Sequence, residues 1–217
     1  MQFADIKKLQ TKTEFPALTE VSKVLEASEE KLIINTINWK DYSYKPGVLL
    51  ALAYSHHEIF LRFDVFEEHF KAEMTESNQN VYEDSCVEFF VSPDSEGIYY
   101  NFEFNGIGTC LMGSGTGREN SKRVDPEIIS QIRRLSSIET GPVKEKSGKF
   151  EWSLTIAIPF TVFFHHRITE LNGKQFRANF YKCGDGLKVP HYVTWSPVGT
   201  ENPDFHRPEF FGTLNFT

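Results

Sequence analysis

The 217-residue sequence lacks any long apolar run, any excess of basic charge and any abundance of cysteine. Its apolar runs all fall short of the roughly 20 residues that a membrane-spanning helix needs, so we expect no membrane partner. The 30 acidic residues outnumber the 23 basic ones, and the resulting net charge of -7 offers no attraction to a phosphate backbone. We therefore exclude nucleic acid as a partner.

Signals for targeting and for covalent cross-linking are also missing. Residues 1–8 lack the apolar stretch of a secretory signal, so we expect a cytoplasmic protein, or a periplasmic or extracellular one if a signal has been removed. Cys86, Cys110 and Cys183 are odd in number and form no C-x-x-C pair, which indicates neither a disulfide framework nor a thiolate zinc site. We expect them to be buried free thiols.

Repeats and phosphate-binding motifs are absent as well. No internal repeat with a period of about 20 to 50 residues is visible, which excludes a propeller or solenoid. The glycine-rich segment 106–117 lacks the Gly-Lys-Ser/Thr ending of a phosphate loop and is expected to hold a strand beside a loop. The length suits one domain, because domains have roughly 100 to 200 residues. We expect residues 1–33 to form an entry segment packed on a single domain of residues 34–217.

What the sequence does have is aromatic residues, 14% of the chain with 20 Phe and 8 Tyr. Such side chains bury large areas in sheets and also form flat platforms for ligands. In 59–65 the residues Ile59, Leu61, Phe63 and Val65 share one face while Arg62 and Asp64 point away, and 150–158 alternates throughout. Both patterns predict half-buried strands. Residues 49–54 precede the first of these strands across the polar loop 55–58, so the two are expected to form an antiparallel hairpin.

A second hairpin is predicted where the strand 86–91 is followed by a turn and by the alternating segment 100–104. Short helical excursions are expected at 125–134 and after Pro159. Short strands separated by turns predict an all-β fold, an antiparallel β-sandwich of jelly-roll or immunoglobulin-like type.

Two aromatic residues near polar groups are candidates for a ligand site. Tyr82 lies at the entrance of an apolar strand that Glu88 interrupts, and Trp195 stands between a strand and a proline-containing loop. Alternation alone leaves Glu88 facing either solvent or a ligand, and a single Trp is as readily a core residue as a platform. Pyranose rings have apolar C–H faces that stack on aromatic rings, while carboxylates, amides and guanidinium groups bind their hydroxyls.

The segments that frame these residues resemble family 9 carbohydrate-binding modules. The similar segments are 82–90 (Tyr-Glu-Asp-Ser-Cys-Val-Glu-Phe-Phe), 99–105 (Tyr-Tyr-Asn-Phe-Glu-Phe-Asn) and 210–216 (Phe-Phe-Gly-Thr-Leu-Asn-Phe). The resemblance implies a β-sandwich that holds a sugar between two aromatic rings without catalysis. Several family members bind small sugars or the reducing ends of plant polysaccharides, of which xylan is one candidate, and some carry structural calcium.

Residue by residue, Tyr82 matches the family's first aromatic, which is commonly Trp, and Glu88 matches its acid. Trp195 matches the second aromatic. Arg177 and Asn179 are added from alternation, because they share one face of a predicted strand. For calcium, Asp64, Glu67, Glu68 and Asp84 supply oxygens without a fixed ligand spacing, and Asp64 and Asp84 are the candidates we name.

Alternative functions stay open from the sequence. A glycosidase needs two carboxyls on either side of a bond, whereas Glu88 and Glu103 are expected on neighbouring strands of one sheet face. A haem-binding sandwich could use Met74, Met112 and some of the seven His, and a scaffold that has lost sugar binding would look similar. We expect a monomer that binds a saccharide and acts in polysaccharide catabolism beside a glycanase partner.

Overall fold

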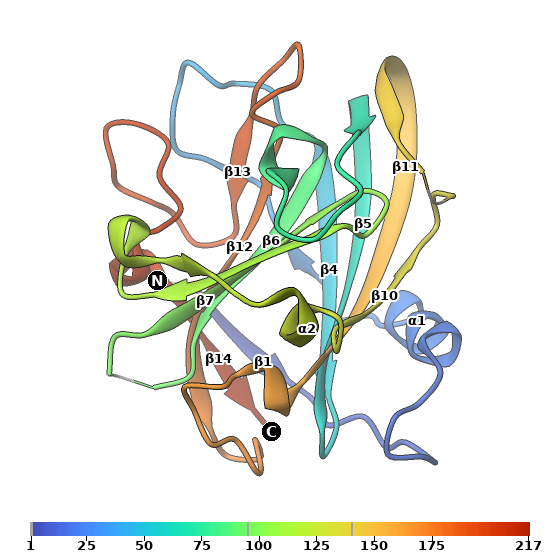
Figure 1. Ribbon diagram of the computed structural model, residues 1–217, viewed down its shortest axis with the longest axis vertical. Coiled ribbons are helices and arrows are strands. Elements are labelled where there is room, and N and C mark those ends of the chain that lie inside the picture. The colour runs from blue at the N-terminus through green and yellow to red at the C-terminus, as the bar shows by residue number, and fades with distance from the viewer. Residues whose placement is uncertain (1, 95, 140) are drawn as a thin grey trace.

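The computed structural model describes residues 2–94, 96–139 and 141–217 and contains two β-sheets packed face to face (Figure 1). The first sheet has the strand order β1-β14-β12-β6-β7-β8-β9, with β13 paired to β12 and β3 to β13. Its strands are β1 (Phe3–Ile6), β3 (Thr36–Ile37), β6 (Cys86–Ser92), β7 (Tyr99–Asn105), β8 (Cys110–Gly115), β9 (Lys122–Arg123), β12 (Gln175–Cys183), β13 (Tyr192–Thr194) and β14 (Gly212–Phe216).

The second sheet has the order β10-β11-β5-β4-β2, and all its pairings are antiparallel. In the first sheet the described pairings are antiparallel except that β1 runs parallel to β14. The strands of the second sheet are β2 (Leu32–Ile33), β4 (Gly47–Tyr54), β5 (Glu58–Ala72), β10 (Arg133–Ser136) and β11 (Val143–Pro159). The all-β sandwich expected from the sequence is confirmed.

Both predicted hairpins are present. β4 and β5 pair around the turn at residues 55–57, and β6 pairs with β7 in the register Glu88 to Glu103. The glycine-rich segment contains β8, as expected. The helical excursions are short: α2 (Pro126–Ile129) and one 3-10 turn at Phe160–Val162. No helix among the described residues is both long and apolar enough to cross a membrane.

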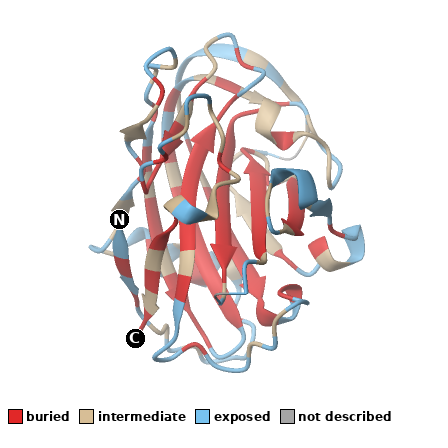
Figure 2. Cartoon of the chain, turned by 90° about the vertical axis from the view of Figure 1, so that its left-hand side faces the viewer, coloured by how far each residue is buried: buried red, intermediate tan, exposed pale blue. Residues whose placement is uncertain are grey.

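The main core lies between the sheets because alternation sends one side chain in two to the inner face. On the first sheet the rings of Phe102, Phe89 and Phe180 stack across β7, β6 and β12, with centroid separations of 5.9 and 5.1 Å. Trp152 and Phe63 face them from the second sheet as part of the same buried cluster. Figure 2 shows buried residues along the strands and exposed ones concentrated in the connections.

Helix α1 (Leu18–Glu26) covers the outer face of the second sheet, where Val21 and Leu25 pack against Phe60. The N-terminal segment thus contributes both this helix and the edge strand β1.

The outer face of the first sheet is apolar too. A second aromatic cluster, which we call the outer cluster, covers it and includes residues of the loops before β6 and after β13. Its buried residues are Trp39, Val81, Cys86, Phe90, Tyr99, Leu111, Tyr181, Cys183, Val198, Phe205 and Phe211. A sheet buried on both faces explains why the sequence is so rich in Phe and Tyr.

Candidate functional site

A cavity of about 360 Å³ opens on the outer face of the first sheet, beside the outer cluster. Its floor comes from Glu88 and Phe90 of β6, Glu103 of β7 and Cys183 at the end of β12. These side chains point outward because their neighbours in each strand take the inner face. The wall and rim come from connections, namely Tyr82, Arg118, Asp185, Tyr192 and residues 203–206.

Two carboxylates lie side by side on the cavity floor. Glu88 and Glu103 are direct cross-strand partners and are 2% and 5% exposed. The Cys183 thiol donates to Glu88 Oε1 over 3.0 Å, and Asn101 Nδ2 donates to Glu103 Oε1 over 2.9 Å. Glu103 Oε2 is buried and has no hydrogen-bond partner among the described residues.

The environment of this acid pair favours the neutral form of each group. Burial raises the pKa of Glu88 well above its ordinary value, and the charge of Glu103 raises it further. Burial likewise raises the pKa of Glu103 to about 7, although its hydrogen bond from Asn101 opposes the shift. Near neutral pH the pair can therefore offer both a proton donor and acceptor oxygens to a polar ligand.

Aromatic rings form the wall of the cavity. Phe205 stacks on Tyr181, which rises from β12, and its ring meets the edge of Tyr192 at a centroid distance of 6.0 Å. Tyr82 and Tyr192 are only partly buried, so their rings can contact a ligand. The cavity thus combines apolar ring faces with buried acids.

Charged groups surround the cavity opening. Arg118 Nη2 and Nε donate to Asp204 Oδ1 over 2.8 and 3.1 Å, which ties the connection after β8 to the loop before β14. His206 Nδ1 and Tyr99 Oη form a hydrogen bond of 2.7 Å. Burial lowers the pKa of His206 to about 4. His206 is accordingly neutral at pH 7.

The five site residues expected from the sequence divide into two groups. Tyr82 and Glu88 line the cavity, and Glu88 faces it rather than open solvent. Trp195 is 4% exposed and belongs to the core between the sheets, where its ring meets Phe180 at 5.5 Å. The structure therefore does not bring Tyr82 and Trp195 together as two rings of one site.

Arg177 and Asn179 do lie on the outer face of β12, opposite Phe176 and Phe180, as alternation predicts. Both side chains donate hydrogen bonds to backbone carbonyls, and neither lines the cavity. Arg177 donates to the carbonyl of Phe211, and Asn179 Nδ2 donates to Ser196 O over 2.9 Å. These side chains fix the connections at either end of the loop that carries Phe205.

Sequence reasoning did not select most of the wall and rim. The alternation of apolar and polar residues predicts strands but not how the connections between them fold over the sheet. These connections supply Tyr192, Phe205, Arg118, Asp185 and Asp204. The one available signal was the run Pro-Asp-Phe-His-Arg-Pro at 203–208, which places an aromatic and several charges between two prolines.

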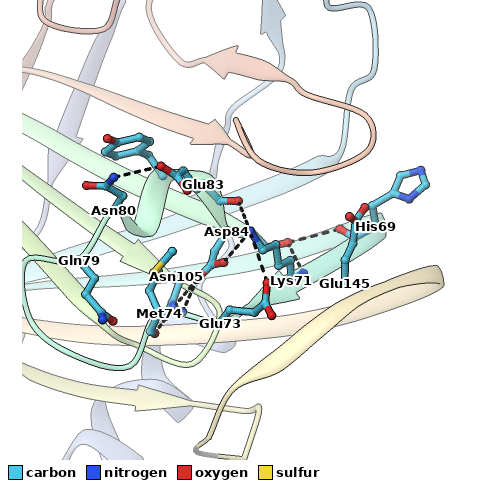
Figure 3. Close-up of polar contacts among 12 residues, drawn as sticks. His69, Lys71, Glu73, Met74, Gln79, Asn80, Glu83, Asp84, Asn105 and Glu145 are labelled. Carbon is cyan, nitrogen blue, oxygen red and sulfur yellow. Dashed lines mark hydrogen bonds and ion pairs between the residues drawn. The ribbon is translucent and has the colours of Figure 1, made fainter.

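The two aspartates considered for calcium both have cationic neighbours, and Figure 3 shows those around Asp84. Asp84 Oδ1 is 3.7 Å from Lys71 Nζ, while its Oδ2 accepts from Met74 N and from Asn105 Nδ2 over 2.9 and 3.0 Å. Lys71 Nζ also lies 3.6 Å from Glu73 Oε2.

Asp64 is paired with Arg62 and Lys31 at 2.9 and 3.2 Å. Each carboxylate thus has a cationic neighbour, while Asp84 Oδ1 accepts no hydrogen bond among the described residues. The methionines considered as haem ligands also lie apart, Met112 in the inner core and Met74 against the outer cluster.

A comparison with protein families matches residues 19–216 to the model described as carbohydrate-binding family 9. The chain belongs to carbohydrate-binding family 9. This family 9 protein is also similar to a protein from Bacteroides uniformis ATCC 8492, described as a putative carbohydrate-binding protein. The two are 40% identical with a TM-score of 0.95, over 100% of this chain and 99% of the other. A comparison of this chain with curated proteins found no match.

Two structures of a family 9 carbohydrate-binding module from Caldicellulosiruptor kristjanssonii share the fold at 10% identity. The one in complex with glucose has a TM-score of 0.60, over 100% of this chain and 96% of the other. The one in complex with cellotriose has a TM-score of 0.57, over 99% and 93%. At this identity the likeness shows the fold alone.

Proposed function

We propose that this protein binds the end of a saccharide, without catalysis, in the cavity between the outer cluster and the loops that cover it. The observation that carries the proposal is the cavity's composition, with partly exposed aromatic rings above a floor of two buried carboxylates. A volume of about 360 Å³ is near the lower end of the range for ligand pockets, which suits one or two sugar rings.

Each part of the cavity has a role in this proposal. The rings of Tyr82, Tyr192 and Phe205 offer apolar surface to the C–H face of a pyranose. Glu88 and Glu103 meet its hydroxyl groups, and the unpartnered Glu103 Oε2 gains a hydrogen bond when a hydroxyl reaches it. Glucose and cellotriose, the ligands of the distant family 9 structures, are the natural first probes.

Binding without hydrolysis is supported by the placement of the acids. Glycosidases hold two carboxyls on opposite sides of the scissile bond, about 5 to 10 Å apart. Glu88 and Glu103 instead extend from adjacent strands on the same sheet face. We infer that any contribution to polysaccharide catabolism, with xylan among the candidate polymers, comes through a glycanase partner that this chain assists.

Isothermal titration calorimetry of the full chain against glucose, cellotriose and xylo-oligosaccharides tests the proposal. Tyr82→Ala should weaken binding by about 5- to 100-fold, the scale of one lost aromatic contact. Tyr44→Ala is the matched control, because this substitution also removes a tyrosine ring and Tyr44 lies outside the cavity. A folded wild-type protein that binds none of these saccharides would refute the proposal.

Two further variants separate the cavity from the pairing expected from the sequence. Glu103→Gln should weaken binding, whereas Trp195→Phe, which keeps an apolar ring in the core, should leave affinity unchanged. Loss of binding in Trp195→Phe with full binding in Tyr82→Ala would move the site away from this cavity. Incubation of the protein with cellotriose followed by chromatography should show no glucose or cellobiose.

A further inference from the structure

Two cysteines that are far apart in the sequence meet at the edge of the cavity floor. Cys86 of β6 and Cys183 of β12 are direct cross-strand partners, and Glu88 follows Cys86 on the same face. The Cys183 and Cys86 sulfurs lie 3.0 and 4.0 Å from Glu88 Oε1. The two sulfurs and a Glu88 oxygen all lie within 4.8 Å of one another, and the three residues are at most 2% exposed.

We propose that Cys86, Cys183 and Glu88 bind a thiophilic divalent cation of the zinc type at the base of the cavity. In a tetrahedral zinc site, bonds of about 2.3 Å to sulfur and 2.0 Å to oxygen place two sulfurs and an oxygen about 3.5 to 3.8 Å apart. The separations in this cluster bracket that range, so an ion requires only small side-chain shifts.

The type of donor selects the type of cation. Thiolate sulfur favours zinc and its soft relatives, whereas calcium and magnesium prefer oxygen ligands alone. Without an ion, burial raises the pKa of Cys86 to about 12, so its thiol is protonated and forms only weak hydrogen bonds. A divalent cation would replace those protons, and its two positive charges would offset two of the three negative charges of two thiolates and a carboxylate.

Two further observations point to a ligand here. Glu88 and Cys183 both line the cavity, which gives an ion an entry path and leaves room for a fourth ligand from water or from the adjacent Asp185. The buried Glu103 Oε2 beside Glu88 has no partner among the described residues, as is expected of an acceptor that awaits a polar group. By contrast, Asp64 is already paired with Arg62 at 2.9 Å.

Cobalt is the probe for the first experiment, because thiolate bound to Co²⁺ gives a charge-transfer band in the near ultraviolet. The full chain, reduced and freed of metal with a chelator, is titrated with Co²⁺ and then with Zn²⁺. We expect the band to saturate at one equivalent, to be displaced by Zn²⁺, and to be unaffected by an excess of Ca²⁺. No band in the folded protein, or displacement by Ca²⁺, would overturn the proposal.

The three cysteines provide a matched set of variants. Cys86→Ser and Cys183→Ser should reduce the band and lower the Zn²⁺ affinity by more than the roughly 10- to 100-fold that loss of an outer-shell partner costs. Cys110→Ser is the control, because Cys110 is equally buried but lies in the inner core. Equal loss in Cys110→Ser would overturn the proposal.

Glu88→Gln preserves both thiols and gives a test that does not depend on replacing a cysteine. This variant should retain the charge-transfer band while binding Zn²⁺ more weakly, and unchanged affinity would remove Glu88 from the site. Circular dichroism of each variant confirms that it is folded. The cobalt readout does not depend on sugar binding, because it reports thiolate coordination directly.

Discussion

The ring of Phe205 lies flat on the ring of Tyr181, with their centroids 4.0 Å apart and their planes inclined by 7°. Tyr181 Oη also donates to the carbonyl of Phe205 over 3.1 Å. Because Tyr181 belongs to β12, these two contacts fasten the loop at residues 203–206 to the first sheet. Asp204 and His206, on either side of Phe205, are thereby held at the cavity.

Phe205→Leu should therefore weaken saccharide binding and lower stability together. The change removes a stacked ring worth about 0.5–1.5 kcal/mol beyond its buried area, and the affinity should fall about 5- to 10-fold. Urea unfolding and calorimetry measure the two effects. Phe66→Leu is the control, since Phe66 is 43% exposed on β5 and should change stability by no more than about 0.5 kcal/mol. Equal effects of the two changes would contradict the anchoring role.

A buried ion pair joins the two sheets on the inner face. Lys182 Nζ of β12 is 2.9 Å from Glu67 Oε2 of β5, both side chains are fully buried, and Trp152 Nε1 donates to Glu67 Oε1 over 2.6 Å. Lys182→Met leaves the Glu67 charge buried without its partner and should cost about 3–5 kcal/mol in urea unfolding. Adding Glu67→Gln should recover much of that loss, and a purely additive double variant would contradict the coupling.

The sandwich is predictable from the sequence because burial of one sheet face imposes a period of two. Trp152, Leu154 and Ile156 show this period in β11, and all three lie in the inner core. Glu88 and Tyr82 are predictable from the motif around β6, and both line the cavity.

The rest of the site depends on tertiary contacts and strand register, which the alternation of apolar and polar residues does not predict. Trp195 follows a short strand, and only the tertiary structure shows that its ring enters the inner core rather than the cavity. Phe205 reaches the cavity because its loop folds back onto Tyr181. Cys86 and Cys183 meet because of the register between β6 and β12, which neither strand reveals alone.

Acid should destabilise the protein through His191, which is buried as a neutral ring. Lys182 Nζ donates to His191 Nε2 over 2.9 Å, His191 Nδ1 donates to Val189 O over 3.0 Å, and Tyr44 and His69 are the other titratable groups nearby. Burial and the charge of Lys182 lower the His191 pKa to about 2. The folded ring thus stays neutral while the unfolded ring takes up a proton below about pH 6.5.

The sign follows from proton binding. Because the unfolded state binds more protons, this contribution to stability is complete above about pH 6.5 and falls by about 1.4 kcal/mol per unit as the pH drops further. His191→Gln removes the titration. Between pH 6.5 and 4.5 the wild-type protein should lose about 2–3 kcal/mol more than the variant in urea unfolding. Parallel pH profiles for the two proteins would contradict this role of His191.

Gly212 should be intolerant of any side chain because Trp195 packs directly on it. A Cβ at this position would lie 2.5 Å from Trp195 Cζ3 and 2.8 Å from the backbone oxygen of Gln2. Gly212→Ala should therefore lower stability by about 1–3 kcal/mol through overpacking, as measured by urea unfolding. Gly117→Ala is the matched control, because a Cβ there has nothing within 4 Å.

The Trp195→Phe background shows whether the indole causes this cost. A smaller ring leaves space beside position 212, so Gly212→Ala should be less destabilising there than in the wild-type protein. The contact with the Gln2 oxygen remains, and the recovery should accordingly be partial. If Gly212→Ala lowers the free energy of unfolding equally in both backgrounds, Trp195 does not pack against Gly212. That outcome would contradict the placement of Trp195 in the inner core.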